Sequence, residues 1–284
     1  MTRPQLPNWF RIALSFLTVL SFLPQLRRLW LTKNSAGISI YYVLFNVIVA
    51  TNQFTIIFAL LFTYPGGLGR FTHRPITTGD WLNFLHVSVT LLVFLAFFAL
   101  TIVYRPAGDS LQKRITISLY SLFLLFTIIP EAFLLAAGYA EDQYGIKLLE
   151  LVLFIPISMG NLLATGLGAL SVVFQARQVL QQQRQRSSLP TALSSFSLLA
   201  QAVVFAILAT SWVWRVSWEN PPSRIGVKQW FATYGWAVVQ NAIFALVQFS
   251  LFCMLHYSGR AGLLRASSPM GQNVEVEPLL HGHF

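Results

Sequence analysis

Polar side chains that could bind a solute occur inside long apolar stretches of this 284-residue chain. At membrane depth an amide or imidazole must find a partner away from water, so it either lines a polar cavity or bonds a neighbouring helix. Amides can bind a hydroxyl, carboxylate or ammonium group, but they cannot carry a proton through a cycle. The residues expected to line a cavity are Asn46, Gln201 and Asn241, with Asn161 and His86 as secondary candidates. The amides expected to join helices are Asn52, Gln53, Gln240 and Gln248.

Glu131 is the carboxylate that lies well inside an apolar run, directly after Pro130. Burial would raise the pKa of such a carboxyl and could make it a proton-carrying group. It could equally pair with His86 or an arginine. Because the run that carries it is expected at the periphery of the bundle, a structural role is favoured.

Residue patterns typical of enzymes do not occur in the sequence. No His, Cys, Asp or Glu cluster has the spacing of metal ligands, and there is no Gly-rich phosphate loop or nucleophile elbow. The single cysteine, Cys253, excludes an intramolecular disulfide and a Cys-rich metal site. We therefore expect a protein that is not an enzyme and that binds no cofactor or metal.

Long apolar runs must position the polar residues. The chain is 55% hydrophobic and only 10% charged, whereas soluble domains carry about 25% charged residues. The runs are apolar on all sides and long enough to cross ~30 Å of hydrocarbon. Their approximate ranges are 9–31, 40–63, 81–104, 115–138, 148–180, 189–214 and 231–257. They predict an all-α membrane protein with seven transmembrane helices.

The net charge of +10 comes from basic residues placed between the runs, which is typical of membrane topology and not of a nucleic-acid partner. Seven spans would put the two termini on opposite sides. One side would carry Arg27, Arg28, Lys33, Arg105, Lys113, Arg114, Arg177, Arg184, Arg186, Arg260 and Arg265. The other would carry Arg3, Arg11, Arg70, Arg74, Lys147, Arg215, Arg224 and Lys228. This bias favours a cytosolic C-terminus and a lumenal N-terminus.

The chain contains an internal repeat. LSFLPQLRRLW (20–30) matches LSVVFQARQVL (170–180) at Gln25/Gln175 and Arg27/Arg177, and GISIYYVLFN (37–46) then aligns with ALSSFSLLAQ (192–201). The repeat predicts two parallel three-helix bundles joined by a linker helix (3+1+3), with a solute site between them near the midplane. The expected division is a first repeat at 1–104, a linker helix and its loops at 105–147, a second repeat at 148–257 and a disordered cytosolic tail at 258–284.

The segment from Pro24-Gln25 to Asn34-Ser35-Ala36-Gly37 resembles a PQ-loop repeat, the signature of lysosomal and vacuolar amino-acid and cystine exporters, with the SWEET sugar facilitators as structural relatives. The second copy is degenerate, because Phe174 stands where the proline would be. In cystine-type relatives an acidic residue used in proton coupling falls where this chain has the amides of Asn46 and Gln201. The resemblance also implies that Asn241 matches an asparagine that holds solute in SWEET-like relatives.

Pro24 marks a hinge or a static kink, because a proline inside a helix removes a backbone hydrogen bond and frees carbonyl groups. We expect Gln25 to satisfy one of these carbonyls. In the family this hinge is thought to bend between inward- and outward-open states. Gln175 is the matched residue of the second copy, and Pro156 could supply the flexibility that Phe174 lacks.

The C-terminal segment fits an acidic dileucine sorting signal through Glu275, Leu279 and Leu280, which a cytosolic adaptor would read. The expected function is transport of a small polar solute, such as an amino acid, by alternating access across a vacuolar or lysosome-like membrane, as a facilitator. The alternative is a non-transporting PQ-loop membrane protein that acts as a receptor, a sorting factor or a lipid-linked-sugar accessory factor. The sequence leaves the oligomeric state open.

Overall fold

The computed structural model describes residues 6–63, 75–137, 159–184, 193–215, 230–231 and 235–266, and all of the regular structure among them is helical. The helices are α1 (Asn8–Thr32), α2 (Ile40–Phe58) with a π-helical end η1 (Ala59–Thr63), α3 (Thr78–Val103), η2 (Ala107–Asp109), α4 (Ser110–Ala137), α6 (Asn161–Arg184), α7 (Ser195–Arg215) and α9 (Trp236–Ala266). Among the described residues, seven helices are long and apolar enough to cross a membrane.

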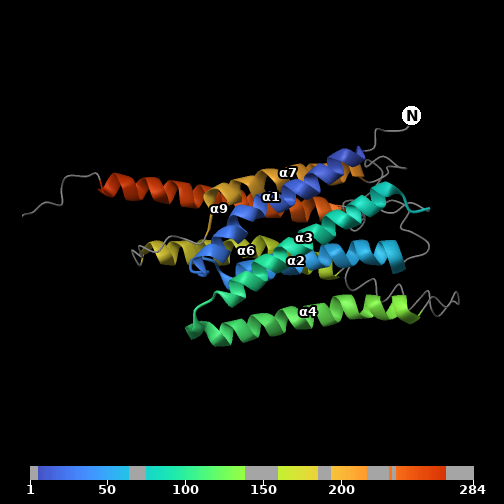
Figure 1. The fold of residues 1–284 in the computed structure, drawn as a ribbon, viewed down its shortest axis with the longest axis horizontal. Coiled ribbons are helices and arrows are strands. Elements are labelled where there is room, and N and C mark those ends of the chain that lie inside the picture. Colours follow the sequence, from blue (N-terminus) through green and yellow to red (C-terminus); the bar gives the residue numbers. More distant parts are fainter. Residues whose placement is uncertain are drawn as a thin grey trace, which may run out of the picture.

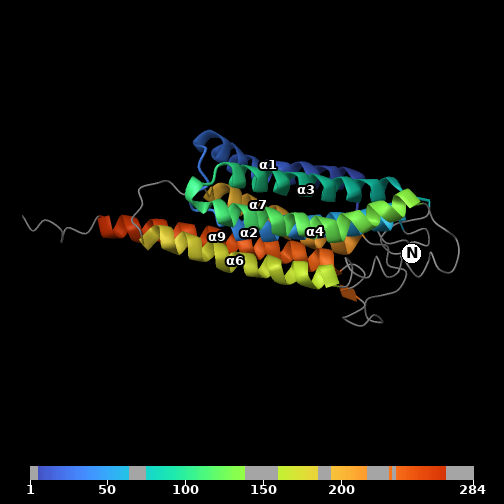
Figure 2. The same cartoon turned by 90° about the horizontal axis from the view of Figure 1, so that it is seen from below.

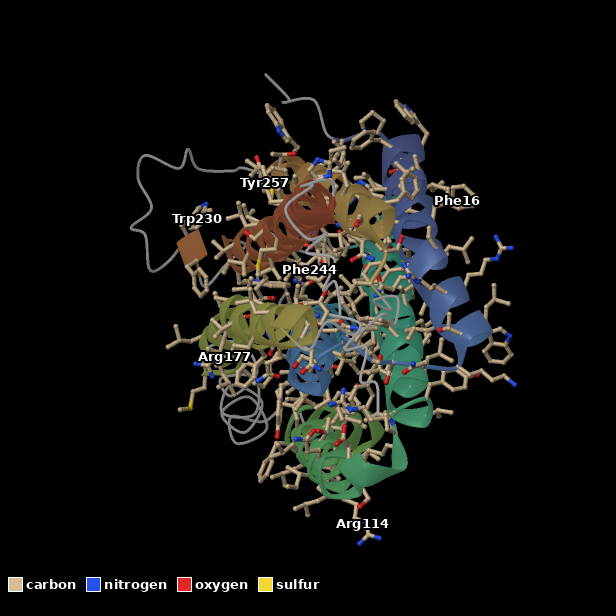
Figure 3. The ribbon with its side chains drawn as sticks, turned by 90° about the vertical axis from the view of Figure 1, so that its left-hand side faces the viewer. Phe16, Arg114, Arg177, Trp230, Phe244 and Tyr257 are labelled. Atoms are coloured by element: carbon tan, nitrogen blue, oxygen red, sulfur yellow. The ribbon has the colours of Figure 1, made fainter. Side chains whose placement is uncertain are left out.

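The long helices lie side by side along one axis (Figures 1 and 2). α3 packs against both α1 and α2, and α9 packs against both α6 and α7. Two further interfaces, α1 with α7 and α2 with α6, close these helices into a ring. α4 packs on α2 and η1 outside the ring, as the end-on view in Figure 3 makes plain.

Burial follows the pattern expected of a bundle in lipid. Large apolar side chains on the outer surface are exposed, including Phe16 on α1, which points away from the bundle in Figure 3. Many amide and hydroxyl side chains are instead buried between helices. This arrangement lets polar groups bond one another while lipid contacts the apolar surface.

Local sequence explains where the helices begin and end. Thr77 and Asp80 form a capping box at the start of α3. α1 is capped by Lys33, whose φ of 48° is left-handed and whose N–H bonds the Leu29 carbonyl at 3.0 Å. Gly37, at φ 85°, then turns the chain into α2 where a side chain would be strained.

Two helix boundaries differ from those of the apolar runs. α9 continues through Ala266, beyond Tyr257 and into the segment expected to be a disordered tail. Propagating a formed helix costs little once it has left the apolar run, so hydrophobicity alone misplaces its end. For the fifth run, 148–180, the described helix is α6, which continues past the run to Arg184.

Candidate functional site

A small cavity lies inside the helix ring, between α2, α3, α7 and α9. Its lining consists of Asn46, Val49, Ala50, Gln53, Thr90, Phe94, Phe205, Gln240, Asn241 and Phe244. Phe244 lies near the centre of the bundle in Figure 3. The cavity thus brings together Asn46 and Asn241, two of the residues expected from the sequence to meet a solute.

Both asparagines present a hydrogen-bond acceptor to this cavity. Asn46 Nδ2 donates to the Tyr42 carbonyl at 2.7 Å, and Asn241 Nδ2 donates to the Ala237 carbonyl at 2.6 Å. A carbonyl can only accept, so each amide nitrogen must face its own helix and each Oδ1 must face away from that carbonyl. Neither Oδ1 has a protein donor among the described residues.

The other polar lining groups also bond within the protein. Thr90 Oγ1 donates to the His86 carbonyl at 2.9 Å, and Gln53 Nε2 donates to Gln240 Oε1 at 3.1 Å. The hydroxyl of Thr90 keeps lone pairs, and the Oε1 of Gln53 has no donor among the described residues. The described lining keeps acceptor atoms together with the second N–H of its amides and carries no ionisable side chain, so it can bind a ligand that brings N–H or O–H groups.

Phenylalanines close one side of the cavity. Phe205 and Phe244 lie 4.3 Å apart by ring centroid, and Phe94 lies 5.2 Å from Phe244. Phe22 of α1 completes the cluster at 5.0 Å from Phe94. These phenylalanines come from four different helices. A change in how the helices pack must therefore rearrange the aromatic cluster. Aromatic faces also attract an ammonium group.

A second set of amides joins helices. Asn52 Nδ2 bonds Asn161 Oδ1 at 2.8 Å, which links α2 to α6. Gln240 Nε2 lies 3.4 Å from the same Asn161 oxygen, and Gln248 Nε2 bonds the Tyr42 hydroxyl at 2.6 Å. Asn161 is fully buried in this network and does not line the cavity. The network fixes the packing of α2, α6 and α9.

Gln201 and His86 also lie outside the cavity lining. Gln201 Nε2 bonds Ser197 Oγ at 3.0 Å, and Ser197 Oγ donates to the Ser21 carbonyl at 2.6 Å. His86 Nδ1 pairs with Ser15 Oγ at 3.0 Å between α3 and α1. Gln201 Nε2 also lies 3.5 Å from the Ser21 carbonyl of α1, so each of the two residues bonds across a helix interface.

A carbonyl beside Pro24 finds a partner that the sequence did not predict. The Ser21 carbonyl, one turn before Pro24, accepts its bond from Ser197 of α7. Gln25, which we expected to fill this role, is 2% exposed, and neither Nε2 nor Oε1 has a hydrogen-bond partner among the described residues. Serine is the better donor here because α7 lies against this face of α1, a contact that only the tertiary structure reveals.

Gln175, the matched residue of the second half, is fully bonded. Its Nε2 donates to the Gly37 carbonyl at 2.7 Å, and its Oε1 accepts from Ser39 N–H at 2.8 Å. The side chain thus ties α6 to the turn that starts α2. Phe174 packs beside it against Tyr41 and Phe45 of α2, at 5.3 and 5.5 Å between ring centroids.

The remaining predicted residues are placed as follows. Glu131 is 1% exposed on α4, outside the cavity lining. Pro156 and the sorting-signal residues Glu275, Leu279 and Leu280 lie outside the described residues. Within the described part of the chain, no group of three or more His, Cys, Asp or Glu side chains could hold a metal ion.

Sequence reasoning missed two kinds of site residue. Phe94, Phe205 and Phe244 gave no signal, because phenylalanine is common throughout the apolar runs. Arg11 and Arg215 were assigned as topology determinants between runs, yet each is 4% exposed and bonds Asn83 of α3. The available signal for their burial was their position. Arg11 lies in the first turn of α1, and Arg215 is the last residue of α7.

Residues 6–65 match the family model of the PQ loop repeat. No curated protein and no solved structure matches the chain. The matched segment spans α1, the turn at Gly37, and α2 with η1. Together with the seven apolar helices, the match identifies an integral multi-pass membrane protein that carries a PQ-loop repeat.

Proposed function

We propose that the protein moves a small polar solute, an amino acid or a similar metabolite, by alternating access and as a facilitator. The observation that carries this proposal is the small cavity inside the helix ring, whose mainly apolar lining includes Asn46 and Asn241. Four acceptors without a charge suit a solute with several N–H or O–H groups, and the phenylalanine faces suit an ammonium group. The amides at Asn46 and Gln201, where cystine-type relatives carry an acid, favour a facilitator over a proton symporter.

The proposed transport unit is a pair of like-oriented three-helix bundles, α1–α3 and α6–α9, with α4 as the linker. Two observations support this division. The sequence matches at Gln25/Gln175 relate the two parts, and in each part the third helix packs against both the first and the second. Bundles related in this way place a solute site at their interface, and rocking of one against the other opens it alternately to each side.

Flux of labelled solutes into proteoliposomes tests the proposal. We expect flux for amino acids or hydroxylated solutes and little for an organic acid of equal size without donor groups. Asn46→Ala and Asn241→Ala should each lower flux by roughly tenfold, the effect of losing ~1.4 kcal/mol of solute stabilisation. Thr210→Ala is the control, because Thr210 is exposed on α7 away from the cavity. Equal flux in all these variants would remove the cavity from the mechanism.

The second candidate is a non-transporting PQ-loop membrane protein that acts as a receptor, a sorting factor or a lipid-linked-sugar accessory factor. The substitution of Phe174 for the second proline favours it, as does a repeat match confined to residues 6–65. Absence of flux for every amino acid and sugar, with a cellular phenotype that survives Asn46→Ala, would support this candidate. In both cases we propose a vacuolar or lysosome-like membrane, with an adaptor reading Glu275, Leu279 and Leu280.

A further inference from the structure

Two arginines are buried at the end of the ring where α1 and α3 begin and α7 ends. Arg11 Nη1 donates to the Asn83 Oδ1 atom at 3.1 Å and to the Gly79 carbonyl at 2.7 Å. Arg215 Nη1 donates to the same Asn83 oxygen at 3.4 Å. Two cations therefore sit side by side around one neutral amide oxygen. Such an arrangement is costly unless a negative charge joins it.

The backbone makes room for this cluster. A side chain at position 79 would place its Cβ 2.9 Å from Arg11 Nη1, so the glycine allows the guanidinium to reach the α3 backbone. Arg215 stacks on Trp212 of its own helix, with the guanidinium carbon 4.7 Å from the ring centroid. Both arginines are thus held in place before any ligand binds.

Arg215 leaves two donors unused. Its Nε and Nη2 atoms are buried and have no hydrogen-bond partner, and no ion pair links Arg215 to a carboxylate within the described ranges. Nε–H and Nη2–H point in parallel from one edge of a guanidinium. That edge is the fork that a carboxylate binds with both of its oxygens.

The net charge of the arginine cluster determines which anion would balance it. The carboxylate of Asp80 is the acidic group beside Arg11, and its Oδ2 is held by the N–H and hydroxyl of Thr77 at 2.9 and 2.7 Å. Among the described residues of this cluster, two arginines and one aspartate leave a single positive charge. A monoanion balances this charge, whereas a phosphate dianion would exceed it.

We propose that Arg11, Asn83 and Arg215 form a binding site for a small carboxylate at the predicted lumenal end of the protein. Asn83 and Thr90 of α3, seven residues apart, share a helix face that leads from this site to the central cavity. Thr90 is the lining residue of α3 nearest to Asn83, and the helix rises roughly 10 Å between the two. One small solute cannot span that distance, so the arginine site is separate from the cavity and is occupied independently of it.

Thermal unfolding of the purified full-length protein in detergent tests the site without any flux measurement. Sodium acetate is the probe, and ionic strength is held constant with the bulky HEPES anion. At about one hundred times its Kd, acetate should raise the Tm by roughly 5 °C. Arg215→Gln should abolish this rise. Arg177→Gln, whose exposed side chain lies on the outside of α6 in Figure 3, should retain it.

Asn83→Asp provides a test that does not depend on removing a buried arginine. It places a carboxylate of the same shape between Arg11 and Arg215, so the Tm should rise in acetate-free buffer and respond little to acetate. A wild-type Tm that is insensitive to acetate would overturn the proposal, as would an acetate response that persists in Arg215→Gln. A response to chloride or phosphate as large as the response to acetate would overturn the assignment to carboxylates. None of these outcomes bears on solute flux through the cavity.

Discussion

At the scale of single residues, Gln25 and Gln175 occupy matched positions but differ in bonding. Gln175 bonds the Gly37 carbonyl and the Ser39 N–H, whereas both polar atoms of Gln25 are buried without partners among the described residues. In the sequence alignment, Ser194 stands where Ser39 does.

This difference predicts opposite effects for one substitution. Gln25→Met keeps the side-chain length and removes two unsatisfied polar atoms, so it should stabilise the protein by about 1 kcal/mol. Gln175→Met should destabilise it by about 1–3 kcal/mol, because it leaves the Gly37 carbonyl and the Ser39 N–H unpaired. The Tm values of both variants in the same detergent check the prediction. Equal shifts in one direction would mean that the two positions are equivalent.

The residue types of the site could be predicted from the sequence, but not which way their side chains point. The sequence singles out amides at depth, and the structure puts Asn46 and Asn241 at the cavity while Gln201 and Asn161 bond across interfaces. Helical periodicity fixes which residues share a face, but not which neighbour that face meets. Arg215 was assigned a topology role for the same reason, since its bond to Asn83 of α3 is a tertiary contact.

At the scale of helices, α1 combines a proline with an interface that changes along its length. Near its start α1 bonds α3 through Ser15 and His86, and at Ser21 it bonds α7 through Ser197. Pro24 removes the backbone donor for the carbonyl of Leu20, which makes the following turn the weakest point of the helix. Bending there would move the end of α1 relative to α7.

Pro24→Ala should therefore slow transport without weakening solute binding. The alanine restores the missing backbone bond and stiffens α1. We expect flux to fall by about tenfold, or ~1.4 kcal/mol on the barrier, with a Kd within about twofold of the wild type. Pro130→Ala is the matched control, because Pro130 lies inside α4, outside the ring. If both variants transport at the wild-type rate, the Pro24 kink is static.

Apolar length predicts the helices themselves well, because only a helix satisfies every backbone group across the hydrocarbon. The limits of α9 and α6 were less predictable, since a helix can continue into polar sequence beyond the membrane. Phe174 illustrates what an apolar pattern hides. In the sequence it stands where the first copy of the repeat has a proline. In the structure it packs in the interface between α6 and α2, beside the Gln175 bonds.

At the scale of the whole molecule, the order of helices around the ring is the feature that the sequence could least predict. The internal repeat relates α1 to α6 and α2 to α7, but it does not say which helices meet between the two parts. The structure pairs α1 with α7 and α2 with α6. The first helix of each part thus contacts the second helix of the other. Like orientation of the two parts requires an even number of spans before the second part begins, and α1, α2, α3 and α4 supply four.

The sidedness of the termini tests this organisation directly. The chain contains no N-x-S/T sequon, so an added sequon is the sole acceptor for N-glycosylation. A sequon-bearing tag at the N-terminus should be glycosylated, because the basic residues favour a lumenal N-terminus, and an endoglycosidase should reverse its shift on a gel. The same tag at the C-terminus should stay unmodified. Glycosylation of both tags would place the termini on one side, make the number of spans even, and remove the basis for two like-oriented bundles around the cavity.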